Sequence, residues 1–229
     1  MKRRAFVMGL VFALWAGGVG VGAVELFRYE GTASPMGAPT AQWPAGTQLI
    51  PGSNEATLVM AVHPHCPCSI ATMDELAVFA AHSQGRVRMY VLMVCPPGAA
   101  AAWAKTSLWN SAQAIPGVTV IADLGGREAK RFGVATSGET LLYGPDLRLL
   151  FSGGITESRG HSGDNDGESA IETLVRDPGR FAGQGVHTPV YGCALFSEED
   201  NAAQLPGGQA PDIAQQAATG PADGASWHR

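Results

Sequence analysis

The sequence has 229 residues, of which 45% are hydrophobic and 15% are charged, so it can form one globular domain with a buried core and some appendages. The formal net charge is −5, with a basic N-terminus and a charge of about −4 in the last 34 residues. No basic stripe lies between these ends. Nucleic acid is therefore not an expected partner.

The chain begins with a candidate membrane segment. Residues 5–24 carry no charge and directly follow three basic residues at positions 2–4. A helix of about 20 apolar residues spans the hydrocarbon core of a bilayer. Because basic flanks stay cytoplasmic, we expect residues 1–24 to be a single-pass anchor in a bacterial inner membrane, with the C-terminal domain in the periplasm. A cleaved signal is the alternative, since VGA at residues 21–23 resembles a cleavage site.

Three regions are expected after this segment. Residues 25–56 are rich in proline, glycine, alanine and threonine and are predicted to be a linker or N-terminal extension. Residues 57–196 alternate between short apolar runs and stretches with helical spacing, which indicates one folded domain. Residues 197–229 lack periodic hydrophobic residues and are predicted to be a disordered acidic tail.

The folded region contains alternating strands and helices. The expected strands are residues 57–62, 87–94, 118–122, 140–143 and 148–152, and the expected helices are residues 69–82, 99–114, 127–132 and 168–176. Strands that alternate with helices pair in parallel through right-handed crossovers. The turn sequence GPDL at residues 144–147 adds an antiparallel hairpin. The predicted fold class is α/β, a mixed sheet with helices on both faces, preceded by one N-terminal transmembrane helix.

The segment HPHCPCS at residues 63–69 stands between the first expected strand and the first expected helix. Free amide groups and the helix dipole favour negative charge at this position. A thiolate carries such a charge and is both the nucleophile and the metal ligand of cysteine chemistry. We therefore predict Cys66 and Cys68 as the reactive centre. A structural disulfide between them is the alternative, but it would close almost no loop and constrain the unfolded chain little.

The sequence resembles the thioredoxin superfamily, and especially the membrane-anchored thioredoxin-like group that includes the RedB proteins. The resemblance covers about residues 25–195 and is carried by the segments VHPHCPCS, LLYGPDLRLLFSGGI, RGHSGDN and VYGCALF. It implies a thioredoxin-like sheet and a periplasm-facing redox or metal-handling role. A link to respiratory oxidase maturation follows by analogy alone.

Two departures from the thioredoxin pattern matter. Thioredoxins have a Cys-x-x-Cys motif, whereas here Ser69 takes the place of the second cysteine and Cys68 comes one residue early. A Cys-x-Cys disulfide closes a small, strained ring that is easily reduced, which suits an oxidant or isomerase. Gly138 stands where thioredoxins carry a cis-proline beside the sulfurs, and loss of the proline opens the sulfur pair to other ligands.

Two further cysteines and a histidine are candidates. Cys95 and Cys193 are a possible disulfide or resolving pair. The end of the second expected strand would bring Cys95 near Cys66 as a resolving thiol, but we favour a structural disulfide with Cys193. His161, in the RGHSGDN loop, is expected to border the cysteines, with Asp164 or Asn165 orienting its ring.

Three hypotheses follow. The leading one is a thiol-disulfide oxidoreductase that needs no cofactor, in which Cys66 forms a mixed disulfide with a periplasmic protein partner and Cys68 resolves it. The second is a Cu(I) chaperone that binds the metal through Cys66, Cys68, His65 and His161, because thiolate and imidazole suit Cu(I). His63 is a weaker ligand candidate. A peroxide reductase ranks last, because the expected threonine and arginine activators are not evident. The sequence leaves the oligomeric state open.

Overall fold

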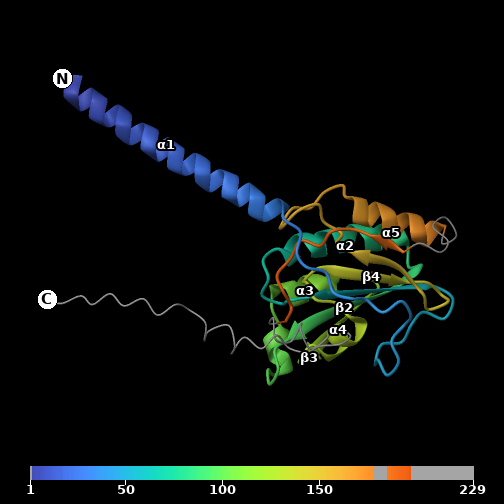
Figure 1. The fold of residues 1–229 in the computed structure, drawn as a ribbon. Helices are drawn as coiled ribbons and strands as arrows, with labels where there is room; N and C mark the ends of the chain where they lie inside the picture. Colours follow the sequence, from blue (N-terminus) through green and yellow to red (C-terminus); the bar gives the residue numbers. More distant parts are fainter. Residues whose placement is uncertain (1, 178–184, 197–229) are drawn as a thin grey trace, which may run out of the picture. The chain divides into compact units, whose positions relative to one another are not determined.

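One long helix begins the chain in the computed structural model, which describes residues 2–177 and 185–196 (Figure 1). This helix, α1 (Lys2–Gly31), contains the one stretch among the described residues that is long and apolar enough to cross a membrane. It extends beyond the predicted anchor into a polar last turn, where Arg28 and Glu25 form an ion pair of 2.9 Å. The predicted acidic tail lies outside the described residues.

A six-stranded mixed sheet forms the centre of the domain. Its order is β3-β2-β1-β4-β5-β6. The strands are β1 (Ala56–Val62), β2 (Val87–Cys95), β3 (Val118–Leu124), β4 (Glu139–Tyr143), β5 (Leu149–Gly153) and β6 (Val186–His187). Strands β1, β2 and β3 are parallel, whereas β4 pairs antiparallel with both β1 and β5. The predicted strands and hairpin are confirmed, and only the two-residue β6 was not expected.

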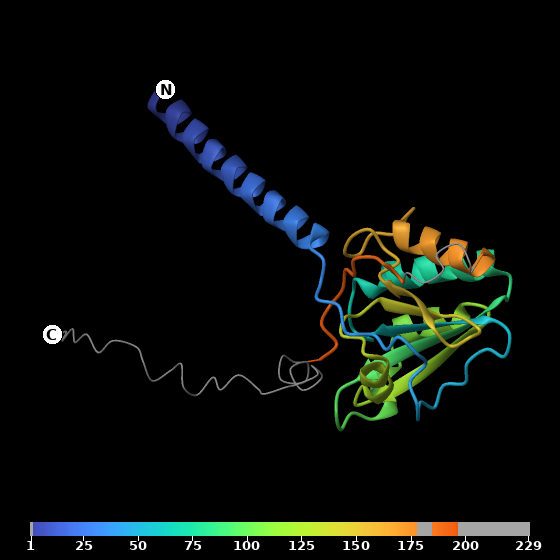
Figure 2. The same ribbon diagram turned by 45° about the vertical axis from the view of Figure 1, so that its right-hand side comes forward.

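Three helices cover one face of this sheet. They are α2 (Ser69–Ser83), α3 (Ser107–Ala114) and α5 (Asp166–Arg176), of which α2 and α5 lie side by side (Figure 2). Alternate residues of β1, among them Leu58 and Met60, pack against Leu76 and Phe79 of α2 in the main core. This alternation is expected of a strand whose successive side chains point to opposite faces.

The other face is covered by α4 (Arg127–Phe132) together with residues 35–50, which belong to the predicted linker. Trp43 packs edge-on against Phe132 and Tyr143, with ring centroids 5.0 and 5.2 Å away. The hydroxyl of Tyr90 donates a hydrogen bond of 2.9 Å to the carbonyl of Ile50. The segment after α1 therefore completes the core on this side. The predicted mixed sheet with helices on both faces is confirmed.

The single helix predicted for residues 99–114 is wrong, because the chain breaks into a short 3-10 helix, η1 (Ala101–Ala104), followed by α3. Thr106 causes the break. Its hydroxyl accepts a hydrogen bond from the N–H of Trp109 at the start of α3 and donates one of 3.0 Å to the carbonyl of Pro64. The break thus supports the loop that carries the predicted reactive cysteines.

Helices α2 and α5 also share a group of ionisable side chains. His82 of α2 lies 2.5 Å from Glu172 and 4.0 Å from Glu168, both on α5. Glu75 of α2 is almost fully buried at the same contact. Burial, then the hydrogen bond and negative charge of Glu75, then the charge of Glu172, raise the pKa of Glu168 to about 7, although His82 opposes this effect.

The raised pKa of Glu168 predicts that stability depends on pH. The folded state holds this proton more tightly than the unfolded chain. Its contribution is therefore complete below about pH 4.5 and is lost as the pH rises to about 7. We expect the free energy of unfolding, measured by denaturant titration, to fall across this range. Glu168→Gln should reduce that fall, and Glu157→Gln, at an exposed site after β5, should not. The same fall in Glu168→Gln as in the wild type would contradict the assignment.

Candidate functional site

The loop between β1 and α2 delivers two thiols to the start of a helix. The N–H of Cys66 donates to the carbonyl of His63 (3.0 Å), and the N–H of Ser69 donates to the carbonyl of Cys66 (3.1 Å). Cys68 occupies the N-cap position of α2 with a helical backbone (φ −63°, ψ −26°) and makes no side-chain capping bond. Within this turn Cys66 is only 4% exposed, whereas Cys68 is half-buried.

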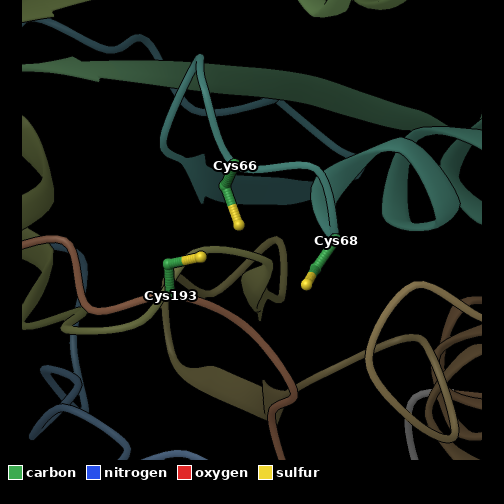
Figure 3. Close-up of side chains that lie close together, drawn as sticks. All are labelled: Cys66, Cys68 and Cys193. Atoms are coloured by element: carbon green, nitrogen blue, oxygen red, sulfur yellow. The ribbon is translucent and has the colours of Figure 1, made fainter. Parts of the chain in front are cut away.

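Cys193 completes a cluster of three thiols. The sulfur atoms of Cys66, Cys68 and Cys193 all lie within 4.8 Å of one another, and Figure 3 shows the three side chains directed toward a common space. Cys193 belongs to residues 190–195, called here the strap, which runs beside the loop from a distant part of the sequence. All three are free thiols, and Cys193 is half-buried.

Ser137, two residues before β4, joins the loop to the strap. Its N–H donates to the carbonyl of Cys193 (2.8 Å), and its hydroxyl accepts from the N–H of His63 (2.8 Å) and shares a hydrogen bond of 2.8 Å with the Ser69 hydroxyl. Gly138 follows with φ +91°, a conformation that favours glycine. No cis peptide bond occurs in the described part of the chain. A serine hydroxyl thus lies in the region where the loss of the cis-proline was predicted.

The three thiols have different acidities. Burial raises the pKa of Cys66, but hydrogen bonds from the Cys193 thiol, the Ser69 hydroxyl and the backbone N–H groups of Cys193 and Cys68 outweigh burial, so this pKa is lowered. Burial and then the charge of Cys66 raise the pKa of Cys68. Burial, followed by the hydrogen bond and charge of Cys66, raises the pKa of Cys193 to about 12. The first thiolate of the cluster therefore forms on Cys66.

Arg159 provides positive charge at this site, although it is not among the functional residues predicted from the sequence. Its guanidinium lowers the pKa of Cys68 and of Cys193, although larger effects raise both. It also donates a hydrogen bond to the carbonyl of Gly192 in the strap. The available signal was that Arg159 is the one lysine or arginine between positions 149 and 175, inside the RGHSGDN motif region.

Comparison with known proteins finds solved structures that are similar to this chain. No family model matches the chain, and no curated protein matches its sequence. A hypothetical protein from Sinorhizobium meliloti 1021 has a similar structure, with a TM-score of 0.50 and 20% identity over 72% of this chain and 93% of that one. An uncharacterized conserved protein from Geobacillus kaustophilus has a TM-score of 0.47 and 17% identity over 74% of this chain and 92% of that one. MTB dsbF, solved in mixed oxidized and reduced forms, has a TM-score of 0.39 and 15% identity over 54% of this chain and 80% of that one.

The strand order and the cysteines at the start of α2 give the domain a thioredoxin-like fold. The order β2-β1-β4-β5, with β4 and β5 as an antiparallel hairpin and cysteines at the start of the helix after β1, agrees with the resemblance found in the sequence. At these identities the likeness concerns the fold alone, and the chemistry of the site depends on its three thiols.

The predicted pairing of Cys95 with Cys193 is not formed. Cys95 is 1% exposed in the core, where its thiol donates to the carbonyl of Met93 (3.5 Å), and it does not belong to the sulfur cluster. Burial and then the charge of Asp123 raise its pKa. Backbone pairing of the strap with residues 135–137 holds Cys193 at the other cysteines instead.

The predicted histidine ligands lie outside the sulfur cluster. The ring of His65 lies 4.5 Å from that of Trp103, and its Nε2 hydrogen-bonds the carbonyl of Trp103 (3.3 Å). His63 meets the same indole edge-on at 5.4 Å, and burial, then the charge of His65, lowers its pKa. His161 points its Nε2 toward Glu30, 3.5 Å away. The group of possible metal ligands here consists of three cysteines.

The hydrogen bond from Ser69 gives a direct test of the acidity of Cys66. Ser69→Ala removes a donor that stabilises the thiolate, so the pKa of Cys66 should rise. The midpoint is measured as the pH dependence of Cys66 alkylation in the full-length protein in detergent. Ser83→Ala is the matched control, because this buried serine of the same helix donates to the carbonyl of Ala80 instead. A midpoint that does not move in Ser69→Ala would refute the assigned contact.

Proposed function

We propose that this protein is a thiol-disulfide oxidoreductase whose reactive centre is the cluster of Cys66, Cys68 and Cys193. The observation that carries the proposal is the buried Cys66, whose sulfur lies within 4.8 Å of two further thiols that could form a disulfide with it and whose pKa is lowered. A purely structural cysteine would not need this arrangement, because buried structural thiols are inert and have raised pKa values. Cys95 is such a cysteine in the same domain.

The chemistry is a two-electron exchange between thiols and a disulfide. One thiolate attacks a disulfide sulfur, a mixed disulfide forms, and a neighbouring thiol resolves it. A sulfur with a lowered pKa leaves readily, so Cys66 suits the leaving position. The partner is a protein with a thiol pair or a disulfide. A role in respiratory oxidase maturation stays a prediction from the resemblance.

The proposed location is the outer face of a bacterial inner membrane. The basic residues at positions 2–4 precede the apolar part of α1, and basic flanks remain on the cytoplasmic side. The domain that follows α1 would then lie in the periplasm, where disulfides persist. Labelling of the domain's thiols by a membrane-impermeant maleimide only from the cytoplasmic side would contradict this orientation.

Removal of the Cys66 thiol should abolish the exchange. We expect Cys66→Ser in the full-length protein to reduce glutathione disulfide exchange to the uncatalysed rate, because the low-pKa sulfur of the cluster is lost. Cys95→Ser is the control and should exchange at the wild-type rate, since Cys95 lies outside the cluster. Equal rates in Cys66→Ser and the wild type would eliminate the proposal.

Cu(I) binding is a second candidate, favoured by the three-sulfur arrangement. Thiolates are the ligands that Cu(I) prefers. Sulfurs separated by at most 4.8 Å fit around a centre at most about 2.8 Å from each, so small movements reach an ordinary metal–sulfur distance of about 2.3 Å. Cys66, Cys68 and Cys193 would hold the ion as cargo without a histidine. This ligand set differs from the one predicted from the sequence.

Cu(I) bound at the three sulfurs should protect them from alkylation. The reduced full-length protein should take up one equivalent of Cu(I) from a competing chelator and become protected from alkylation at all three cluster thiols. Cys193→Ser should weaken binding at least about tenfold through loss of a thiolate ligand. His65→Ala should leave binding unchanged, because its ring lies on Trp103. Weaker binding in His65→Ala with full binding in Cys193→Ser would contradict the three-sulfur site.

A further inference from the structure

We propose that the working disulfide of this site joins Cys66 to Cys193, not to Cys68, and that it oxidises a dithiol of a partner protein. This inference rests on the thiol-disulfide exchange proposed above and specifies its cysteine pair, its direction and its substrate class. It is carried by the backbone geometry of the loop, by the attachment of the strap and by the exposure of the three thiols.

The turn that contains Cys66 and Cys68 disfavours a bond between them. The N–H of Ser69 donates to the carbonyl of Cys66, and Cys68 has helical backbone angles. Residues two apart in a helical turn do not face each other. A disulfide also requires a dihedral angle near 90° about its S–S bond, and a ring this small meets that requirement only with strain. Bond formation would therefore distort the first turn of α2.

The strap, in contrast, holds Cys193 beside Cys66 through backbone hydrogen bonds to residues 135–137. Ser137 donates its N–H to the carbonyl of Cys193, and the N–H of Leu195 donates to the carbonyl of Ala135, each at 2.8 Å. The sulfur of Cys193 lies within 4.8 Å of the sulfur of Cys66. The backbone thus places the two sulfurs close together before any bond forms.

Close packing and a cation fix the strap at the residue before Cys193. A Cβ atom on Gly192 would lie only 1.9 Å from the carbonyl oxygen of Ser137, so only glycine allows this approach. Arg159 donates to the carbonyl of Gly192 and, at 2.7 Å, to the hydroxyl of Ser34, which also contacts that carbonyl at 2.8 Å. Arg159 is a positioning residue here, because it holds the strap through Gly192 and Ser34.

The exposure of the thiols gives the order of steps. Cys66 is 4% exposed, whereas Cys193 is half-buried and can be approached. A partner thiolate attacks the sulfur of Cys193, a partner–Cys193 bond forms, the Cys66–Cys193 bond breaks, and the electron pair leaves on Cys66. This is the favourable leaving group, because hydrogen bonds lower the pKa of Cys66 despite burial, whereas burial and Cys66 itself raise that of Cys193.

A second attack completes the reaction. The partner's other thiol gives up its proton and attacks the partner sulfur of the mixed disulfide, which releases Cys193 as a thiolate that takes up a proton. The partner loses two electrons and gains a disulfide, while the protein gains two electrons and retains a thiolate on Cys66 and a thiol on Cys193. A second disulfide compound then accepts the two electrons and restores the Cys66–Cys193 bond.

The test is to map the disulfide in the full-length protein. The protein in detergent is equilibrated with glutathione disulfide, quenched with acid, alkylated and digested, and linked peptides are identified by mass spectrometry. A Cys66–Cys193 link is expected. A Cys66–Cys68 or Cys68–Cys193 link in its place would overturn the inference and leave the proposed exchange intact. Three unmodified cluster thiols would overturn both the inference and the proposed exchange.

Brief exposure of the oxidised protein to reduced glutathione should give an adduct on Cys193, and an adduct on Cys66 would overturn the order of steps.

Thermal unfolding provides an independent readout. A Cys66–Cys193 bond closes a loop of roughly 127 residues, whereas a Cys66–Cys68 bond closes almost none. A longer loop constrains the unfolded chain more, so oxidation should raise the unfolding midpoint by on the order of 10 °C. Cys68→Ser should keep this increase and Cys193→Ser should lose it, and Cys95→Ser is the matched control that should keep it. An increase that survives in Cys193→Ser would overturn the pairing.

Discussion

The set of hydrogen bonds that lowers the pKa of the buried Cys66 is the interaction that organises this site. A buried thiolate is stable only when hydrogen-bond donors replace the water that burial removes. Here the donors are the Ser69 hydroxyl, the Cys193 thiol and the backbone N–H groups of Cys68 and Cys193. They come from the start of α2 and from the strap. The acidity of Cys66 is therefore a property of the assembled domain, and the loop between β1 and α2 supplies only part of it.

The need to hold the strap explains several residues that have no role in the loop itself. Ser137 links the strap to both the loop and α2, because its backbone N–H and its hydroxyl serve different segments. Arg159 reaches from the loop after β5 to Gly192 and Ser34. Its guanidinium also stacks over the ring of Tyr29 at 4.8 Å, near the end of α1. The end of α1 and the chain that follows it thus contribute to the structure that positions Cys193.

The segment after α1 has a second structural role on the far face of the sheet. Trp43 fills the space between Phe132 and Tyr143, and Tyr143 donates its hydroxyl proton to the carbonyl of Thr40 (2.9 Å). Without these contacts the apolar side chains of β4 would be uncovered on that face, which is costly in water. Composition alone predicts a linker here, because proline, glycine and threonine without periodic hydrophobic residues are typical of loops.

The sequence by itself determined the features that depend on neighbouring residues. These are the apolar helix at the N-terminus, the strands, the GPDL hairpin turn and the position of Cys66 and Cys68 at the start of α2, because periodicity and turn chemistry are local. The break in the helix at Thr106 could not be predicted, because the Thr106 hydroxyl donates a hydrogen bond to the carbonyl of Pro64, 42 residues away. Only the tertiary structure showed that Cys193 lies beside Cys66, that Cys95 lies in the core and that His161 lies beside Glu30. Pairing of the strap with residues 135–137 brings Cys193 to Cys66, and a contact between segments so far apart leaves no local pattern in the chain.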